Sequence, residues 1–452
     1  MTGDVVIDLV AIPLTPIHVG DGSVLTPEDY DLEGGELVRF SASAVLRSLP
    51  DTARKTYGDA LDRGDLHGAW RVLRQARRGE HVLERIGVGA AARDEIEKLL
   101  GPELRAGEIR PMLRSGGAQC LRGSSLKGAS RTALLSSRVE GVQRAIKDAI
   151  HRHSPRTGSA SDEAQRLLLG HANTDQDPFR FVAVSDIVLP KGSTRVDRVV
   201  NWRPPNPTRG KDAAAEKIQI IVERVRAATD GAVTPVPLTL CVAAGRLVGA
   251  LARDKQHTRT PRRPVGIQQL LRATNDFHWT LFDEERERFY MDAPEIMGAL
   301  EGAFRVHAPN GKVLDMAEVR RRTDMILLRV GRFGQFESKS LAGVREGWNA
   351  QAKPPRPMKV GNTRNLVKTA EHAPLVPFGW LLLAPEGTKS AASTPARTAL
   401  HARIAPPAPP RPARWRLDGE VVEELSRDTE RVSVRLSNGD IDTVSPDELE
   451  PL

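Results

Sequence analysis

The sequence has few cysteines, few aromatic residues and no long apolar run. Its two cysteines, Cys120 and Cys241, are far apart and in no metal-binding spacing, which suits a reducing, cytoplasmic setting. Aromatic residues make up 4% of the chain, so we do not expect a recognition surface built mainly of stacked bases on aromatic rings. No apolar stretch approaches the roughly 20 residues of a membrane-spanning helix, and the first residues lack the pattern of a secretory signal.

The charge is divided unevenly along the chain. The whole chain has a net charge of +8. Residues 418–452 carry a net charge of −8, so residues 1–417 carry +16. Arginine is much commoner than lysine in this basic part, and guanidinium groups bind phosphate in a bidentate way. The charge therefore favours a polyanionic partner, although a genome rich in G and C would enrich arginine without any such cause.

The stretch "LRGSSLKGASRTALL" at residues 121–135 is the first candidate site. Its apolar positions recur at helical spacing, and we expect a helix that opens at Ser125 and continues to about residue 150. The loop and first turn would bring backbone amides to a phosphate, and Lys127 and Arg131 lie four apart on one face. The order Gly-Lys-Ser/Thr of a nucleotide-binding P-loop is missing. An ordinary capped amphipathic helix is the alternative.

A second candidate site follows the expected strand at residues 325–330. The sequence Gly331-Arg332-Phe333-Gly334-Gln335 forms a glycine-flanked turn, with Lys339 close behind. Such a turn can press amides, a guanidinium and one aromatic ring against RNA. A strand-to-helix junction would need the same glycines for structural reasons alone.

Apolar runs and turn signals divide the remainder of the chain into expected elements. We expect strands at 5–13, 36–40, 179–189, 235–244 and 378–383, and mostly helical sections at 41–100 and 265–304. His18, between two apolar residues, is either a satisfied core histidine or a group that contacts RNA or acts as a general base. Acidic residues at 21, 28, 29 and 31 have no metal-ligand spacing, and we expect neither a metal nor a cofactor.

Residues 384–414 are rich in alanine and proline and predict an extended linker. Beyond them, alternating apolar residues at 419–425, 431–436 and 441–444, with the turn signal Ser437-Asn438-Gly439-Asp440, predict a small all-β barrel of SH3-like or KOW-like type at 415–452. We therefore divide the chain into a core at 1–383, a linker at 384–414 and this barrel.

Four stretches, taken in order, resemble the RAMP superfamily, the RNA-binding subunits of type III CRISPR complexes. They are "LTPIHVGDG" with "DYDL" and "GGELVRFSASAVL", then "LRGSSLKGASRTAL", then "FRFVAVSDIVLP", and finally "LLRVGRFGQFESKSL" with "TRNLV" and "PFGWLLL". Within the superfamily, their order and spacing are most similar to the fifth-subunit family of the Csm (type III-A) complexes. The resemblance covers roughly residues 5–385, and the barrel at the carboxyl end departs from it.

The resemblance implies an α+β, ferredoxin-like (RRM-like) RAMP core with large insertions, and a cytoplasmic, non-catalytic subunit that caps the 3′ end of the CRISPR guide RNA. Its partners would be that RNA, the target RNA indirectly, and other effector subunits, above all the repeated backbone subunit. The expected RNA-binding residues are His18, Gly123, Ser124, Ser125, Lys127, Arg131, Arg332, Phe333, Gln335 and Lys339. A thumb-like insertion near 190–215 would contact partners through Arg195, Arg198 and Arg203.

Two other functions fit the same sequence. One is a metal-independent endoribonuclease that cuts CRISPR repeat RNA, with His18 as the base and Lys127 or Arg131 stabilising the transition state. The other keeps the superfamily and makes the chain a sibling subunit of a Cmr or type III-D complex, or a slicing backbone subunit with Asp21 or Asp29 as catalyst.

Overall fold

The computed structural model describes residues 4–100, 108–152, 159–171, 173–204, 214–231, 233–256, 258–349, 356–391, 414–417, 420–427, 432–435, 441–445 and 450–451. It divides into two compact units, Met1–Thr394 and Pro395–Leu452. The larger unit holds all the candidate site residues.

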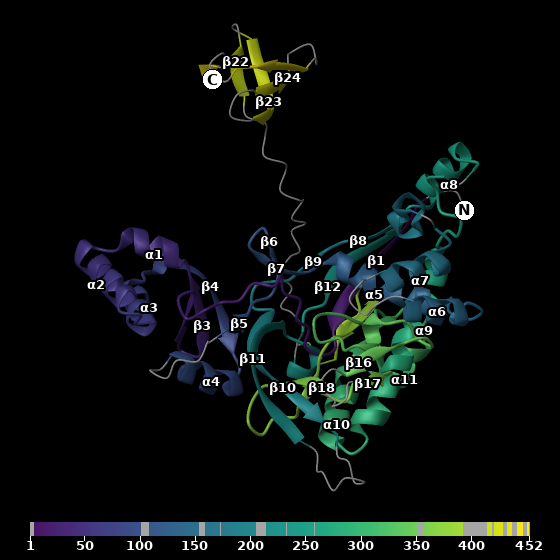
Figure 1. Cartoon of the computed structure of the whole chain (residues 1–452), viewed down its shortest axis with the longest axis horizontal. Helices are drawn as coiled ribbons and strands as arrows, with labels where there is room; N and C mark the ends of the chain where they lie inside the picture. Colours follow the sequence, from purple (N-terminus) through teal and green to yellow (C-terminus); the bar gives the residue numbers. More distant parts are fainter. Residues whose placement is uncertain are drawn as a thin grey trace. The chain divides into compact units, whose positions relative to one another are not determined.

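A five-stranded sheet forms the centre of the larger unit, and Figure 1 shows it beside helices α5 and α9. Its strands follow the order β15 (Ile326–Arg329), β20 (Trp380–Pro385), β1 (Val5–Pro13), β12 (Val236–Val242) and β8 (Val182–Val184). Every neighbouring pair is antiparallel. The apolar run at 5–13 therefore occupies a central strand, as predicted, and its side chains are buried from Leu9 to Pro13.

Helices α5 (Gly123–Ser136) and α9 (Ile267–Glu285) pack against each other and against β15. Along the chain, β1, α5, β8, β12, α9 and β20 alternate as β-α-β-β-α-β, with other elements inserted between them. This is the element order that the ferredoxin-like prediction requires. The mixed α/β class is confirmed, and the ferredoxin-like assignment of the core stays a prediction.

A second sheet places its strands in the order β19 (Val376–Pro377), β18 (Arg364–Lys368), β10 (Thr194–Arg203), β4 (Val82–Val88), β3 (Glu36–Phe40) and β2 (Tyr30–Glu33). Strand β11 (Ala214–Val225) pairs with β10 and with β5 (Ile109–Arg110). The sequence predicted a thumb-like insertion near 190–215, with its arginines available to partners. Instead, residues 194–203 form a strand inside a sheet, because every second or third side chain there is apolar and buried. Residues 205–213 lie outside the described part.

The section at 41–100 is mostly helical, as predicted. The exception is β4, which the sequence pattern did not separate from the helices around it. Its helices are α1 (Ala42–Ser48), α2 (Asp51–Asp62), α3 (Leu66–Ala76) and α4 (Ala90–Leu100). Other helices of this unit are α6 (Gln143–Arg152), α7 (Ser159–Leu169), α8 (Ala244–Arg253), α10 (Pro294–Ala303) and α11 (Met316–Arg321). Small sheets use β6 (Arg114–Ser115), β7 (Ala118–Leu121) and β9 (Ile187–Val188), then β13 (Val306–His307), β14 (Val313–Leu314) and β21 (Lys389–Ser390), and finally β16 (Gly347–Asn349) and β17 (Arg356–Met358).

Two expected elements are interrupted in the structure. Helix α5 ends at Ser136 rather than near residue 150, and α6 begins only at Gln143. The expected single strand at 179–189 is a short 3-10 turn followed by β8 and β9, because Ser185 and Asp186 leave the sheet between them. That interruption positions Asp186 beside α5.

The smaller unit contains a five-stranded sheet in the order β25 (Ile441–Val444), β24 (Val432–Arg435), β23 (Glu420–Arg427), β22 (Arg414–Leu417) and β26 (Glu450–Pro451). The three strands expected from sequence alternation are present. The barrel type, and the boundaries at 383 and 414, stay predictions.

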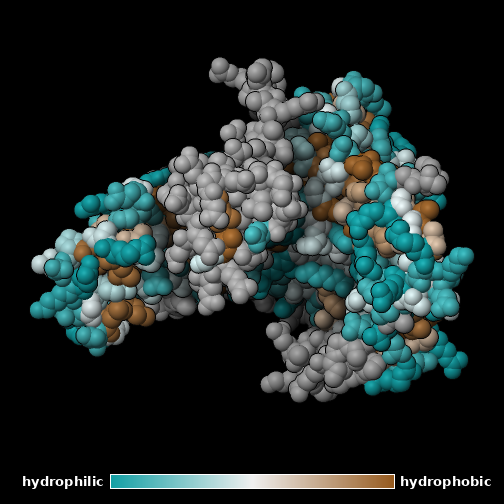
Figure 2. Space-filling view, turned by 90° about the horizontal axis from the view of Figure 1, so that it is seen from above, coloured by the Kyte–Doolittle hydropathy of each residue, from teal (hydrophilic) through white to brown (hydrophobic). Residues whose placement is uncertain are grey.

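No helix among the described residues is long and apolar enough to cross a membrane. On the face of the molecule in Figure 2, hydrophobic side chains occur in small separate groups among hydrophilic ones. The apolar residues are instead concentrated between the sheets and helices, in clusters around Trp380, Leu328 and Phe179.

Candidate nucleic-acid interface

Helix α5 begins two residues earlier than the sequence predicted. It starts at Gly123, whose backbone N–H donates to Oδ1 of Asp186 at 2.7 Å, and the side chains of Ser124 and Ser125 cap nothing. A carboxylate at a helix amino terminus is favoured by the free N–H groups and the helix dipole. The chain therefore already supplies the anion that we expected from a phosphate at this end of the helix.

Gly123 is required for packing. A Cβ at this position would overlap the carbonyl oxygen of Val184 and lie 2.6 Å from that of Ser185. The close backbone approach that the sequence predicted thus occurs between α5 and the chain's own strand β8. The sequence could not distinguish an approach by RNA from an approach by another strand of the protein, because both need a residue without a side chain.

The polar residues of α5 lie on two different faces. Ser125 and Thr132 share one face with Gly128, whereas Lys127 and Arg131 lie on another, since residues two apart point in different directions on a helix. Arg131 is engaged within the protein: it pairs with Asp177 at 2.8 Å, donates to Gln165 and stacks over Phe179. Lys127 is half-buried, and this burial lowers the pKa of its ammonium group.

The segment after β15 turns back on the residues around His18. The N–H of Arg332 donates to the carbonyl oxygen of His18 at 2.8 Å, and Gly331 has a φ of 93°. A side chain at Gly331 would lie 2.7 Å from the same oxygen, so glycine is needed both for the conformation and for the approach. The side chains of Arg332 and Lys339 remain exposed, and Lys339 Nζ donates to the Arg332 carbonyl at 3.0 Å.

These two candidate stretches, about 200 residues apart in sequence, meet at one pocket of about 490 Å³, which we call the basic pocket. Its lining residues are Val19, Gly20, Ser125, Gly128, Ala129, Thr132, Arg329, Val330, Gly331, Arg332, Ser338 and Lys339. Three of these are cations, and none of the described residues that line the pocket is acidic. Arg329 is already paired with Glu285, whereas Arg332 and Lys339 have no acidic partner in the lining. A pocket of small residues, hydroxyl groups and these two cations suits a phosphate backbone.

His18 and Phe333 lie behind this pocket and not in it. His18 is 2% exposed, and its Nδ1 donates to the carbonyl oxygen of Glu223 at 2.7 Å, which leaves Nε2 unprotonated. Burial lowers the pKa of His18 to about 4, and the nearby Arg332 acts in the same direction. The structure thus supports the core-histidine alternative. Phe333 is also buried, with its ring centroid 4.6 Å from that of Phe378, so it cannot stack on a base as expected.

The remaining predicted residues are spread over other parts of the molecule. Ser124 is exposed on α5 but does not line the basic pocket, and Gln335 lines a different one. Arg195 pairs with Asp197 at 2.8 Å and with Asp230 at 3.1 Å, so its charge is already neutralised. The other two arginines of β10, Arg198 and Arg203, are half-buried. Because β10 lies inside a sheet, its arginine side chains are less accessible to a partner than side chains on a loop would be.

The acidic residues near the amino terminus serve local structure. Asp21 accepts hydrogen bonds from Ser23, and Asp29 accepts from Thr26. In the part of the chain that the structure describes, no group of three or more His, Cys, Asp or Glu side chains is placed to hold a metal ion.

No protein-family model matches the sequence, and no curated protein matches it either. Solved structures do match the fold. One is a chain in the cryo-EM structure of a Csm–crRNA–target RNA ternary complex of a type III-A CRISPR-Cas system, at 15% identity and a TM-score of 0.55. The match covers 85% of this chain and 100% of that one. This chain has the fold of a Csm-complex subunit.

A crystal structure of T. onnurineus Csm5 is also similar, at 14% identity and a TM-score of 0.48, with 82% of this chain and 99% of that chain covered. That TM-score is too low to support a conclusion about this chain. The Csm-complex likeness confirms the mixed α/β fold of a Csm-type subunit that the sequence resemblance implied, and the ferredoxin-like core stays a prediction.

Sequence reasoning missed Arg329, which lines the basic pocket from a buried strand. A signal was present, because an arginine that ends the apolar run Met325–Leu328 must be paired or functional if the strand is buried. Sequence reasoning also missed that Asp186 caps α5 at Gly123. The two residues are 63 positions apart, so no local spacing could pair them.

Proposed function

We propose that this chain is a non-catalytic guide-RNA-binding subunit of a type III CRISPR effector complex. It caps the 3′ end of the CRISPR RNA and contacts the repeated backbone subunit. The observation that carries the proposal is the basic pocket, which unites both RNA-binding candidate stretches on a chain with the fold of a Csm-complex subunit.

In this proposal the RNA is held mainly through its phosphates. Arg332 and Lys339 neutralise the negative charge, and Ser125 offers a hydroxyl group in the lining of the basic pocket. The α5 amino terminus takes no part, because Asp186 occupies it. Contacts of this kind read the backbone and not the bases, so binding depends strongly on salt and little on guide sequence.

The experiment that tests this proposal is co-purification. The complete operon is expressed with a tag on this chain, and the RNA that accompanies it is sequenced and cross-linked. Guide RNA cross-linked to this chain near its 3′ end, in a particle of repeated subunits, is the expected result. Protein without RNA, or RNA unrelated to the repeats, refutes the proposal. The same particle identifies a Cmr or type III-D complex by its other subunits.

The endoribonuclease remains the alternative that a direct assay decides. It is the weaker proposal because its base, His18, is buried and already hydrogen-bonded through Nδ1. Purified protein incubated with repeat RNA, with and without EDTA, should leave the RNA intact. Cleavage at one position that His18→Ala abolishes would reverse the choice between the two functions.

A further inference from the structure

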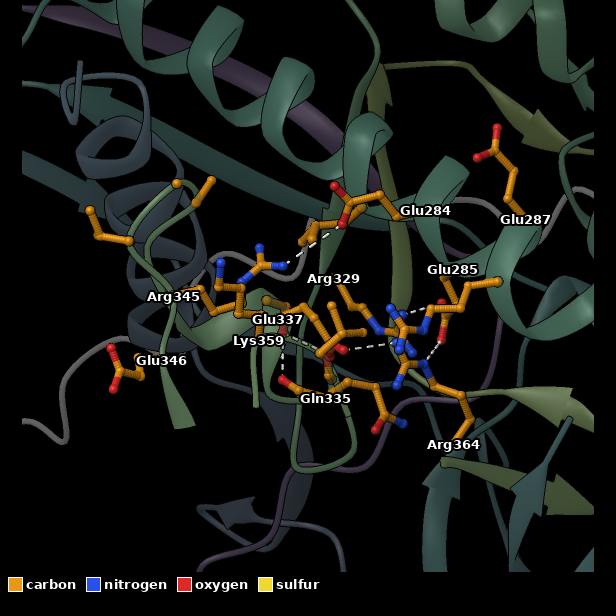
Figure 3. Close-up of a pocket in the computed structure, with 18 of the residues that line it drawn as sticks. Glu284, Glu285, Glu287, Arg329, Gln335, Glu337, Arg345, Glu346, Lys359 and Arg364 are labelled. Carbon is orange, nitrogen blue, oxygen red and sulfur yellow. Dashed lines mark hydrogen bonds and ion pairs between the residues drawn. The ribbon is translucent and has the colours of Figure 1, made fainter. Parts of the chain in front are cut away.

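A second pocket, of about 670 Å³, lies on the other side of the segment that follows β15 (Figure 3). We call it the glutamate pocket. It is lined by the end of α9, by Arg329, by Gly334, Gln335, Glu337 and Ser338, by residues 342–346, and by Lys359, Val360 and Arg364. It shares Arg329 and Ser338 with the basic pocket, so one chain segment separates the two. The volume is within the range of roughly 300 to 1,000 Å³ that is usual for ligand sites.

The floor of the glutamate pocket is a buried ion-pair network. Glu285 accepts from Arg329 Nη1 and from the Tyr290 hydroxyl, at 3.1 Å for the latter, and pairs with Arg364 Nε at 2.9 Å. Arg364 also donates through Nη2 to Oε1 of Glu337 at 3.0 Å. Each of these four charged side chains belongs to a residue that is 5% exposed or less. Two arginines and two glutamates balance, so the network needs no counter-ion.

Hydrogen-bonding capacity is nevertheless left over at the surface of this network. Nε and Nη2 of Arg329, Oε2 of Glu337 and Nε2 of Gln335 are buried and have no hydrogen-bond partner among the described residues. A buried polar atom without a partner costs about 1–3 kcal/mol. Figure 3 shows Arg329 and Glu337 beside each other in the ion-pair network, with the amide of Gln335 below them. These unpartnered donors and this carboxylate acceptor therefore all belong to residues that line the glutamate pocket.

Gln335 is also strained. It has a φ of 68° and is the only non-glycine residue with positive φ in the described part of the chain. Glutamine gains nothing from this conformation, whereas Gly334 beside it could adopt it without strain. Strain of this kind persists where the surroundings hold a side chain in place, and such positions cluster at functional sites. Here the conformation carries the amide of Gln335 into the lining of the glutamate pocket.

We propose that the glutamate pocket binds one nucleobase of the RNA strand, and that it prefers guanine. Guanine offers acceptors, O6 and N7, to the donors of Arg329 and Gln335, and an N–H of its Watson–Crick edge to Oε2 of Glu337. The inference rests on the proposed function: a strand whose phosphates lie against Arg332 and Lys339 places a neighbouring base at the wall that both pockets share. Recognition is thus sequence-independent along the strand except at one nucleotide.

The test uses the full-length protein and fluorescent single-stranded oligouridylates, either plain or with one guanine at each position in turn. A bidentate base contact discriminates by about 1–3 kcal/mol, so guanine at one position should tighten binding by at least about fivefold. Gln335→Asn, which tolerates positive φ, and Glu337→Gln should each remove this preference but keep the affinity for plain oligouridylate. Glu346→Gln, an exposed carboxylate at the same pocket, is the matched control and should change neither.

Each other outcome counts against the inference. If no guanine-containing oligonucleotide binds more tightly than plain oligouridylate, the inference is wrong, and a preference that survives in both pocket variants also overturns it. Guanosine monophosphate that competes as well as the guanine oligonucleotide would assign the pocket to a free nucleotide and not to the strand. Failure of the proposed function looks different, because plain oligouridylate would then not bind and Arg332→Ala would have no effect.

Discussion

Removal of the two exposed cations of the basic pocket should change the salt dependence of RNA binding by a calculable amount. In a double variant, Arg332→Ala with Lys339→Ala, two phosphate contacts are lost. Each contact with a single strand contributes about 0.7 to the slope of log affinity against log salt, so the slope should fall by about 1.4. Between about 50 and about 200 mM salt, the native protein should therefore lose roughly sevenfold more affinity than the variant.

The assay is titration of a labelled single-stranded RNA at four or more salt concentrations. A matched control removes the same charge elsewhere: Lys55→Ala with Arg63→Ala, two exposed cations of α2 and its carboxyl end. The control should keep the native slope. Parallel lines for the pocket variant and the native protein would refute the phosphate site, and an equal fall in both variants would show that only the overall charge matters.

Three further predictions concern stability. Burial lowers the pKa of His18 from 6.5 to about 4, so as the pH falls the unfolded chain binds the proton first. The stability that the neutral His18 contributes is fully present above pH 6.5. It falls by about 3 kcal/mol as the pH drops through 4. Urea unfolding at pH 7 and pH 4.5 should show a smaller loss for His18→Gln, and an equal loss would contradict the assignment. Gly123→Ala should lower the free energy of unfolding by about 1–3 kcal/mol because its Cβ meets strand β8, whereas Gly128→Ala, where a Cβ meets nothing within 4 Å, should not. Glu285→Gln should cost about 3–5 kcal/mol in the same assay, because it leaves buried arginine charge uncompensated, and Glu284→Gln, which is exposed, should cost little.

Local patterns in the sequence were sufficient to locate the main elements. The mostly apolar run at 5–13 predicted a strand, and the helical spacing after Gly123 predicted a helix; both are present. The two glycine-containing stretches around Ser125 and Arg332 were also recognisable, because a tight turn beside a cation needs particular residue types. The resemblance of four stretches in order to the RAMP superfamily then gave the fold that the Csm-complex likeness confirms.

Only the tertiary structure decided which side chains of those stretches are available. The sequence places Lys127 and Arg131 on the same helix as Ser125, but packing turns the two basic residues toward Asp177 and Ser125 toward Arg332. It likewise buries His18 and Phe333 and leaves Arg332 and Lys339 exposed.

The physical reason is the range over which each kind of information acts. Periodicity, turns and caps depend on residues a few positions apart, so the sequence determined the strands, the helices and the approximate place of the site. The partner of a buried charge is set by packing between distant segments: Asp186 reaches Gly123, and Arg364 reaches Glu285 and Glu337. The tertiary structure alone therefore decided which charges are already neutralised and which remain exposed.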